Sequence, residues 1–181
     1  MKDLLWLSRI ESEQGLEKHT PIDVGALLTE LLDEFGAAQP ESKVELDLAT
    51  DYKVPGDYRE LYSAVSNLLW NALKYSKEGN AVKVSWEHKN GSYLLTVTDR
   101  GIGIDAMHIP RLTERFYRVE DSRSSATGGT GLGLAIVKHV AATHGARLQI
   151  ESTVGQGSSF SLVFPEKGAG VSEQQPKASV A

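Results

Sequence analysis

Cysteine is absent from the 181 residues of the chain. Disulfides, thiol catalysis and thiolate metal sites are therefore excluded, and the composition is compatible with a reducing compartment such as the cytoplasm. The sequence also lacks an uninterrupted apolar run of about 18 residues, the length that a membrane-spanning helix needs. Its start does not have the charged-then-apolar pattern of a secretory signal peptide. We therefore expect a soluble segment.

An excess of positive charge is missing as well. Lys and Arg total 19 against 24 Asp and Glu, which gives a formal net charge of -5 and argues against a nucleic-acid partner. No period of 20 to 50 residues repeats along the chain, so solenoids and propellers are excluded. The hydrophobic fraction of 40% fits one ordinary globular domain with a short appendage.

Apolar spacing predicts three helices and five strands in the body of the chain. The predicted helices cover residues 23–35, with Asp23 as N-cap, 57–76 and 132–144. The predicted strands cover residues 43–50, with Val44, Leu46 and Leu48 facing inward, and 81–87, 93–99, 147–152 and 158–164. Asn90-Gly91 is a hairpin turn signal. The element order is not the alternation of a doubly wound parallel sheet, so we predict a mixed sheet covered by helices on one face.

The two ends and one internal segment have different patterns. Residues 1–14 form an amphipathic stretch that is typical of the tail of a longer helix and is marginal alone in water. It either packs on a partner or folds onto its own domain. Residues 101–130 predict a long mobile loop with at most short helices, in which Phe116 and Tyr117 anchor the chain in the core. The last 16 residues are predicted to be disordered.

Four polar side chains share one stripe of the predicted helix 57–76. Glu60, Asn67, Asn71 and Lys74 are spaced by 7, 4 and 3 residues, which places them opposite the apolar face and predicts one site. An Asn carbonyl can ligate Mg²⁺ and Lys can bind phosphate, so the stripe suits an anionic ligand with a hard cation. The alternative is an ordinary solvated helix face.

An acidic residue followed by two glycines ends the predicted strand 93–99. The glycines of the segment Asp99-Arg100-Gly101-Ile102-Gly103 allow close approach of a ligand, and the carboxylate can accept from an exocyclic amine such as that of adenine. An Asp-initiated turn explains the same pattern equally well.

A glycine cluster precedes the predicted helix 132–144. In Gly-Gly-Thr-Gly-Leu-Gly-Leu, residues 128–134, free backbone N–H groups and the helix dipole favour phosphate. The cluster is not a Walker loop, because no Lys-Ser/Thr pair follows it, and Ile136 stands where a dinucleotide fingerprint has its third glycine. The alternative is that the glycines only permit a tight helix entry. Arginines of the preceding loop, such as Arg118, could stabilise charge on a transferred phosphoryl group.

The five histidines are scattered, without the spacing of metal ligands. We therefore predict no histidine metal site, and none of the five is predicted to be catalytic.

Four ordered motifs resemble the N, G1, F and G2 boxes of the ATP-binding domain of sensor histidine kinases. They are ELYSAVSNLLWNALKYS, DRGIGI, ERFYRV and GGTGLGLAIVKH. The resemblance is strong over residues 57–165 and loose over 21–56. It implies a Bergerat-type α/β sandwich, an α+β fold with ATP and Mg²⁺ held under a flexible lid. It also implies three segments: the end of a dimerisation helix with its linker (1–20), the catalytic domain (21–165) and a tail (166–181).

The resemblance also implies roles for individual residues. Asn71 ligates Mg²⁺, Asn67 supports the metal and the phosphates, Lys74 contacts phosphate, and Arg118 faces the γ-phosphate. The remaining ATP-binding positions are Tyr75 beside the adenine, Asp99 on its amino group, Gly101 and Gly103 around it, and Gly129, Thr130, Gly131, Leu132 and Gly133 around the phosphates.

Two departures from the wider fold sharpen this interpretation. Related ATPases such as gyrase have a Glu general base where Asn67 stands here, and an amide cannot take a proton near neutral pH. The phosphoacceptor histidine of the family is also missing, since His19 lacks the acidic and basic neighbours of that motif and lies after the dimerisation helix.

The resemblance implies a kinase that phosphorylates a histidine of its own dimerisation domain, for relay to a response-regulator aspartate. The full-length protein would be a homodimer in the bacterial inner membrane, with this part in the cytoplasm. Two alternatives stay open: an ATPase of the same fold, and a non-catalytic module that binds nucleotide or scaffolds a dimer.

Overall fold

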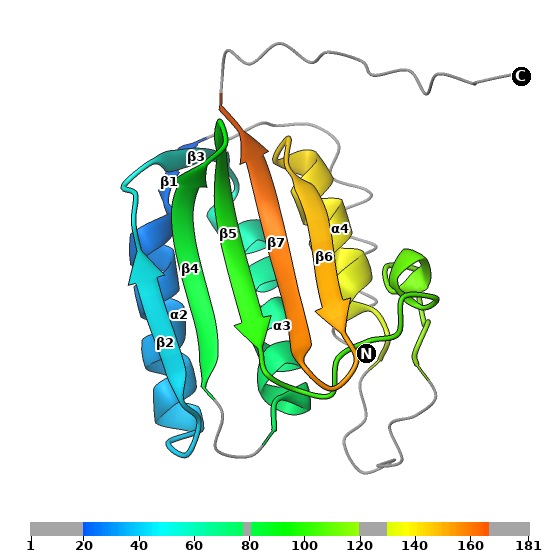
Figure 1. The fold of residues 1–181 in the computed structure, drawn as a ribbon. Coiled ribbons are helices and arrows are strands. Elements are labelled where there is room, and N and C mark those ends of the chain that lie inside the picture. The colour runs from blue at the N-terminus through cyan, green and yellow to red at the C-terminus, as the bar shows by residue number, and fades with distance from the viewer. Residues whose placement is uncertain (1–19, 78–80, 120–129, 167–181) are drawn as a thin grey trace, which may run out of the picture.

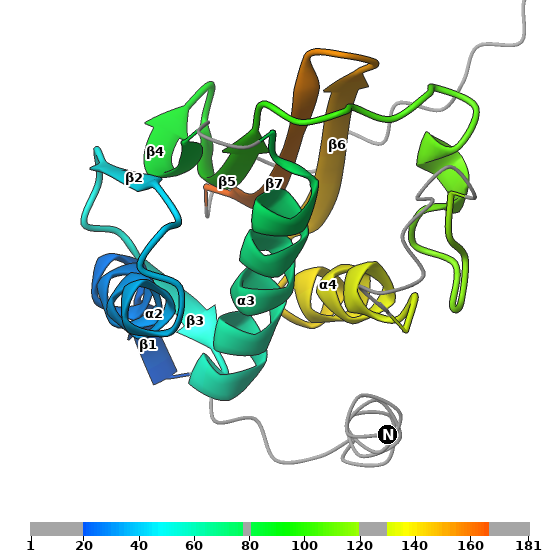
Figure 2. The same cartoon turned by 90° about the horizontal axis from the view of Figure 1, so that it is seen from below.

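The computed structural model describes residues 20–77, 81–119 and 130–166. These residues form a two-layer α+β sandwich, with a five-stranded sheet in one layer and helices in the other. Figure 1 shows the sheet in front of the helices, and Figure 2, seen from below, shows the α-helices of the described residues on the same face of the sheet. The predicted fold class is confirmed.

Two of the three helices begin at an aspartate cap. The Asp23 carboxylate accepts from the N–H of Ala26 at 3.0 Å, as predicted. Asp57 accepts from the N–H groups of Arg59 and Glu60 at 2.8 and 3.1 Å. These bonds satisfy donors that a helix start leaves free, which is why both helices begin where they do. The helices are α2 (Val24–Ala38), α3 (Tyr58–Tyr75) and α4 (Gly133–Thr143).

The main sheet is mixed. Its strand order is β2-β4-β5-β7-β6, with β2 parallel to β4 and the other neighbours antiparallel. The predicted hairpin is present, and its turn residues Asn90 and Gly91 have φ of 52° and 70°. The strands are β2 (Val44–Leu48), β4 (Val82–Lys89), β5 (Ser92–Asp99), β6 (Arg147–Thr153) and β7 (Gly157–Pro165).

Two features of the strands differ from the prediction. A separate antiparallel pair joins β1 (Thr20–Asp23) to β3 (Lys53–Gly56), and β3 escaped prediction because it is short and contains a proline. The apolar residues of β2 are less buried than predicted: Val44 is half-buried against the core, whereas Leu46 is 36% exposed and Leu48, which approaches Gly25 of α2, is 45% exposed. As the last strand of the sheet, β2 has a neighbour on one side only, so its side chains keep contact with water.

The core lies between the sheet and the helices. The predicted apolar face of α3 supplies Leu61, Leu68 and Leu69, all fully buried, and β4 supplies the fully buried Trp86. Because α3 is held by the core along its length, the polar stripe on its other side has a fixed position.

Several predictions lie outside the described residues: the helix over 1–14, Gly129 and nearly all of the tail after residue 165. In the described part of the predicted loop the only helix is the short η1 (Ile109–Arg111), in agreement with the prediction. None of the helices within the described ranges is long and apolar enough to cross a membrane.

Candidate functional site

The stripe on α3 lies against the start of α4. Asn67 donates from Nδ2 to the Ser63 carbonyl at 2.9 Å, which leaves its carbonyl Oδ1 on the other side. A Cβ atom on Gly133, the first residue of α4, would lie 2.7 Å from this Oδ1. The structure therefore brings together Asn67 and the glycine segment, which the sequence separates by more than sixty positions. A side chain at position 133 would collide with the amide.

Asn71 lies one turn further along α3. It is half-buried and makes no side-chain hydrogen bond or ion pair with any residue in the part of the chain that the structure describes. Lys74, the last member of the stripe, and its neighbour Tyr75 are both half-buried, with the Lys74 Nζ 5.1 Å from the centre of the Tyr75 ring. A half-buried amide without a protein partner is free to bind a ligand.

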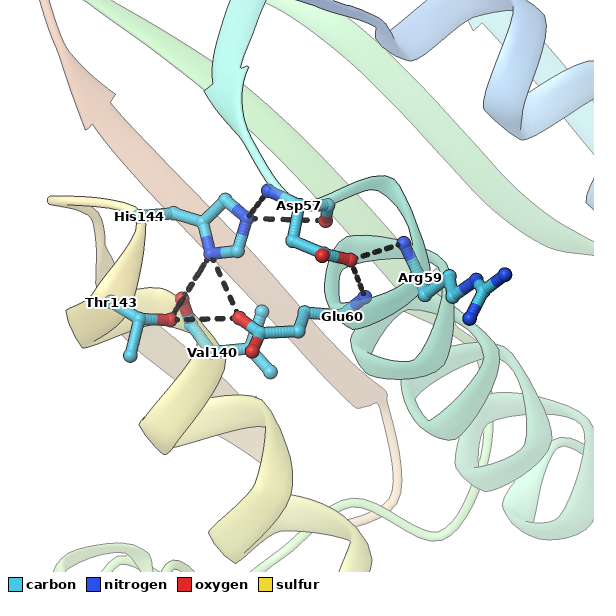
Figure 3. Close-up of polar contacts among 6 residues, drawn as sticks. All are labelled: Asp57, Arg59, Glu60, Val140, Thr143 and His144. Carbon is cyan, nitrogen blue, oxygen red and sulfur yellow. Dashed lines mark hydrogen bonds and ion pairs between the residues drawn. The ribbon is translucent and has the colours of Figure 1, made fainter. Parts of the chain in front are cut away.

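Glu60 does not belong to this group, which corrects the prediction of one site for the whole stripe. Its carboxylate lies at the other end of α4, where it accepts from the Thr143 hydroxyl at 3.3 Å and is 3.9 Å from Nδ1 of His144. Figure 3 shows this cluster. The stripe runs along a helix more than two turns long, so its first and last members face different neighbours.

His144 is a structural residue that the sequence analysis passed over. Its side chain is 2% exposed, and Nε2 accepts from the N–H of Asp57 at 3.1 Å while Nδ1 lies 2.8 Å from the Val140 carbonyl (Figure 3). A Cβ on Gly56 would lie 2.1 Å from the imidazole, so the ring fits only beside glycine. The sequence feature that could have indicated a structural role for this histidine is its position at the end of a predicted helix, directly before a glycine.

Asp99 is buried at the end of β5, with 5% exposure. Burial raises the pKa of this carboxyl, while hydrogen bonds from the backbone N–H groups of Gly101 and Ser158 lower the pKa. The bond from Gly101 is 2.8 Å long and forms the Asp-initiated turn that was one of the two interpretations. A carboxylate has about four acceptor positions, so the turn leaves room for a ligand donor.

The two glycines after Asp99 are packed against other parts of the chain. A Cβ on Gly101 would lie 2.0 Å from the Tyr75 carbonyl oxygen, and one on Gly103, where φ is 69°, would lie 2.1 Å from the Thr153 carbonyl oxygen. The prediction explained these glycines by approach of a ligand, whereas here they permit approach of the backbone. They thereby join the end of α3 and the β6–β7 turn to the end of β5.

In the loop beside the site, one of the two aromatic residues that were predicted to be anchors is placed differently from the prediction. Phe116 is 60% exposed with φ of 66°, so it does not anchor the loop in the core. Tyr117 is half-buried and holds the loop locally, through a 2.7 Å hydrogen bond to Nδ1 of His108 and the Arg111 guanidinium 4.2 Å above its ring. Arg118 is exposed, one residue from the end of this described range.

The glycine segment before α4 is held against this loop. Gly131 has φ of 71°, and its carbonyl accepts from the N–H of Phe116 at 3.0 Å. Thr130 is exposed, whereas the Leu132 side chain is buried, so Leu132 can offer a ligand only its backbone. No side chain of the described residues caps α4, whose first N–H groups are therefore available to an anion.

The oxygen atoms that this site offers to a metal suit Mg²⁺ that arrives bound to a phosphate ligand. The described residues contain no group of three or more His, Asp or Glu side chains that could hold a metal. Two amide oxygens, from Asn67 and Asn71, are present instead, and Mg²⁺ normally completes its shell with substrate phosphates and water. The residues therefore fit a metal that arrives with its nucleotide.

Comparison with known proteins assigns the class. Residues 56–168 match the family described as histidine kinase-, DNA gyrase B- and HSP90-like ATPases, and the chain belongs to this family. Within it, the chain is similar to sensor histidine kinases. It is 43% identical over 180 residues to the phosphate regulon sensor protein PhoR of Pseudomonas aeruginosa, and 42% identical over 166 residues to the sensor-like histidine kinase SenX3 of Mycolicibacterium smegmatis.

These alignments cover 98% and 91% of this chain but only 41% and 43% of the two relatives. The chain thus spans about two fifths of their length. The resemblance that the four motifs indicated is confirmed, as is the particular likeness to PhoR that residues 108–124 and the run GLGLAIVKH suggest.

Solved structures agree. The mycobacterial sensor histidine kinase MprB matches with a TM-score of 0.71 at 32% identity, covering 81% of this chain and 97% of that one. Full-length ShkA, solved in complex with AMPPNP, matches with a TM-score of 0.73 at 25% identity over 90% of this chain and 34% of that one.

Proposed function

We propose that this domain binds Mg-ATP between the α3 stripe, the end of β5 and the glycine segment before α4. The observation that carries the proposal is the contact of Gly133 with Asn67, which sets an uncapped helix start beside amide oxygens. Phosphates would bind the N–H groups of α4, and Asn71 and Asn67 would hold the metal. Asp99 would accept from the adenine amino group at the other end.

We further propose that the γ-phosphoryl group passes to a histidine on the dimerisation domain of the same kinase and then to an aspartate of a response regulator. In the full-length protein this domain would face the cytoplasm, below a membrane-anchored homodimer. The relatives named above are sensor kinases, which supports this assignment. Lys74 and Arg118 would neutralise charge on the phosphates, so catalysis is mostly positioning and charge stabilisation.

The identity of residue 67 favours a kinase over a rapid ATPase. Its Nδ2 is held by the Ser63 carbonyl, so the side chain presents an amide oxygen, which cannot take a proton from water near neutral pH. Bound ATP would therefore persist until a histidine acceptor is presented.

Calorimetric titration with ATP, with and without Mg²⁺, tests the proposal, followed by phosphate release from the same sample over an hour. We expect Mg-dependent binding with negligible release. Steady turnover would overturn the argument from Asn67 and favour the ATPase, and absence of binding would leave only a scaffold role.

Replacement of Asn71 by alanine tests the metal assignment. Asn71→Ala removes an amide without a described protein partner, so we expect the Mg-dependent part of ATP binding to be lost while the urea midpoint stays unchanged. Gln149→Ala removes an exposed amide from β6 and is the matched control. Unchanged Mg-dependent binding in Asn71→Ala would contradict the assignment.

A further inference from the structure

A second concave site lies outside the proposed nucleotide site, between η1, the outer side of α4 and the edge strand β6. Its volume is about 430 Å³. Figure 2 shows η1 and its loop beside α4 and β6. We call it the α4–β6 groove and define it by its lining residues, Ile109, Thr113, Lys138, Ala141, Ala142, Ala146, Arg147, Leu148 and Ile150. None of them belongs to the site described above.

The floor of the groove is apolar and built from short side chains. Ala141 and Ala142 of α4 and Ala146 of the α4–β6 connection, together with Leu148 and Ile150 of β6 and Ile109 of η1, make up most of the lining. Leu148, Ile150 and Ile109 are only half-buried in the structure. A ligand that covered them would remove apolar surface from water, which stabilises the complex. A volume in this range is typical of sites for small organic ligands.

The charge of the groove is opposite in sign to that of the chain. The chain carries a formal charge of -5, yet among the described residues the charged ones that line the groove are Lys138 and Arg147, and none of these lining residues is acidic. Both cations are exposed, and neither forms an ion pair with a residue in the described ranges. Arg can bind a carboxylate through two parallel hydrogen bonds, and Lys adds a point charge.

We propose that the α4–β6 groove binds a small amphiphilic carboxylate, a ligand with an aliphatic chain and a single anionic head. The chain lies on the alanines, Leu148 and Ile150, and the carboxylate meets Arg147 and Lys138. A polyanion such as a nucleotide does not fit, because apolar residues dominate the lining.

The position of the groove connects it to the proposed nucleotide site. Ile109 and Thr113 belong to the loop that continues to Phe116, and the Phe116 N–H donates to the Gly131 carbonyl at 3.0 Å. A ligand that fixes this loop against α4 therefore changes the freedom of the segment beside the phosphates. This second step rests on the proposed function, whereas binding in the groove does not.

The test is a titration of the full chain with decanoate, well below its micelle-forming concentration, followed by NMR of labelled alanine methyl groups. We expect saturable shifts at Ala141, Ala142 and Ala146 and none at Ala26 on α2. Decanol, which lacks the charge, should bind about tenfold more weakly. Equal binding of decanoate and decanol, or shifts that do not saturate at these methyls, would overturn the proposal.

Charge reversal gives the matched variants. Lys138→Glu and Arg147→Glu should each weaken decanoate binding by about threefold, and the double variant by about tenfold, without a change in the far-ultraviolet circular dichroism. Lys89→Glu, on the β4–β5 hairpin, is the control with the same charge change. Ala142→Leu should abolish binding by filling the groove. Full binding by the double variant would contradict the assignment.

A capped helical peptide with leucines on one face and glutamates on the other separates a small ligand from a protein partner. If only this peptide shifts the three methyls, the small-ligand proposal is overturned. The ATP affinity is then compared with and without saturating decanoate, which measures the coupling between the groove and the proposed nucleotide site. By linkage, the decanoate affinity changes by the same factor when ATP is bound. A failure of ATP binding leaves the decanoate result unaffected, so the two proposals fail separately.

Discussion

The contact between α3 and α4 has two ends that use their polar groups in opposite ways. At one end, Asp57, Glu60, Thr143 and His144 are bonded to one another, and both nitrogens of the buried imidazole face hydrogen-bond partners (Figure 3). At the other end, Gly133 lies against Asn67, and no described side chain caps α4. We call these the closed end and the open end.

One pair of helices is thereby both a support and a site. Buried polar groups without partners cost free energy, so a protein normally satisfies them, as the closed end does. The open end leaves N–H groups and the Asn71 amide for a ligand. Among the described residues, the side-chain hydrogen bonds between the two helix ends lie at the closed end, where no ligand is needed.

The largest expected effect comes from removing the closed end. His144→Ala deprives the Asp57 N–H of its partner and leaves a cavity, so we expect the free energy of unfolding in urea to fall by about 3 kcal/mol. His88→Ala removes an exposed imidazole paired with Glu166 and should cost at most about 1 kcal/mol. Equal losses in the two variants would show that the closed end gives no special support.

The open end should respond in ligand affinity rather than in stability. Gly133→Ala places a methyl group 2.7 Å from Oδ1 of Asn67 and pushes the amide away, so we expect ATP affinity to fall by about tenfold, or about 1.4 kcal/mol. The helix propensity of alanine offsets the lost bond to Ser63, so the urea midpoint should stay nearly constant. In the control Gly36→Ala, the methyl group meets open space on α2 and should stabilise without changing affinity. Unchanged ATP affinity in Gly133→Ala would remove position 133 from the site.

The α3 cap tests the closed end more gently. Asp57→Ala removes the carboxylate that accepts from the N–H groups of Arg59 and Glu60, and we expect a loss of about 1 kcal/mol in urea unfolding. The backbone N–H of residue 57 still donates to His144 in this variant. The loss of unfolding free energy should therefore be little more than the contribution of the cap. A loss as large as that of His144→Ala would mean that the cap also holds the imidazole.

The smallest expected effect on stability concerns Asp99 and its pH dependence. Because burial raises the pKa of Asp99 in the folded state above its unfolded value, this group favours folding at acidic pH, and its contribution decreases as pH rises from the unfolded pKa through the folded pKa. Asp99→Asn should therefore flatten that part of the stability curve, measured by urea unfolding between about pH 4 and pH 7. ATP affinity should fall, because the amide loses the anionic acceptor. A variant curve that is parallel to the original would contradict the assignment.

Most of the regular elements follow from local patterns. The cap Asp23, the apolar face of α3 and the Asn90-Gly91 turn depend on interactions between neighbours in the chain, so the sequence predicts them directly. The short strand β3 and the exposed side chains of β2 depend on where a strand lies in a sheet, which no local pattern encodes.

The candidate site was predicted only in part, because some of its contacts follow from the local helical period and others depend on tertiary packing. The helical period places Asn67, Asn71 and Lys74 together because they are less than three turns apart. It also placed Glu60 with them, and only the position of His144 and Thr143 on α4 moves that carboxylate into a different cluster. Phe116 was misjudged because an aromatic side chain predicts burial only when the backbone can turn it inward.

Local patterns along the chain are enough to specify the helices, the hairpin, the class of protein and the types of side chain offered to a ligand. Which of those side chains meet depends on how the elements pack. The contact of Asn67 with Gly133, the packing of Gly101 and Gly103 against distant carbonyls, and the α4–β6 groove all join segments far apart in the chain. Such contacts depend on the packing of whole elements against one core, and no local pattern contains that information.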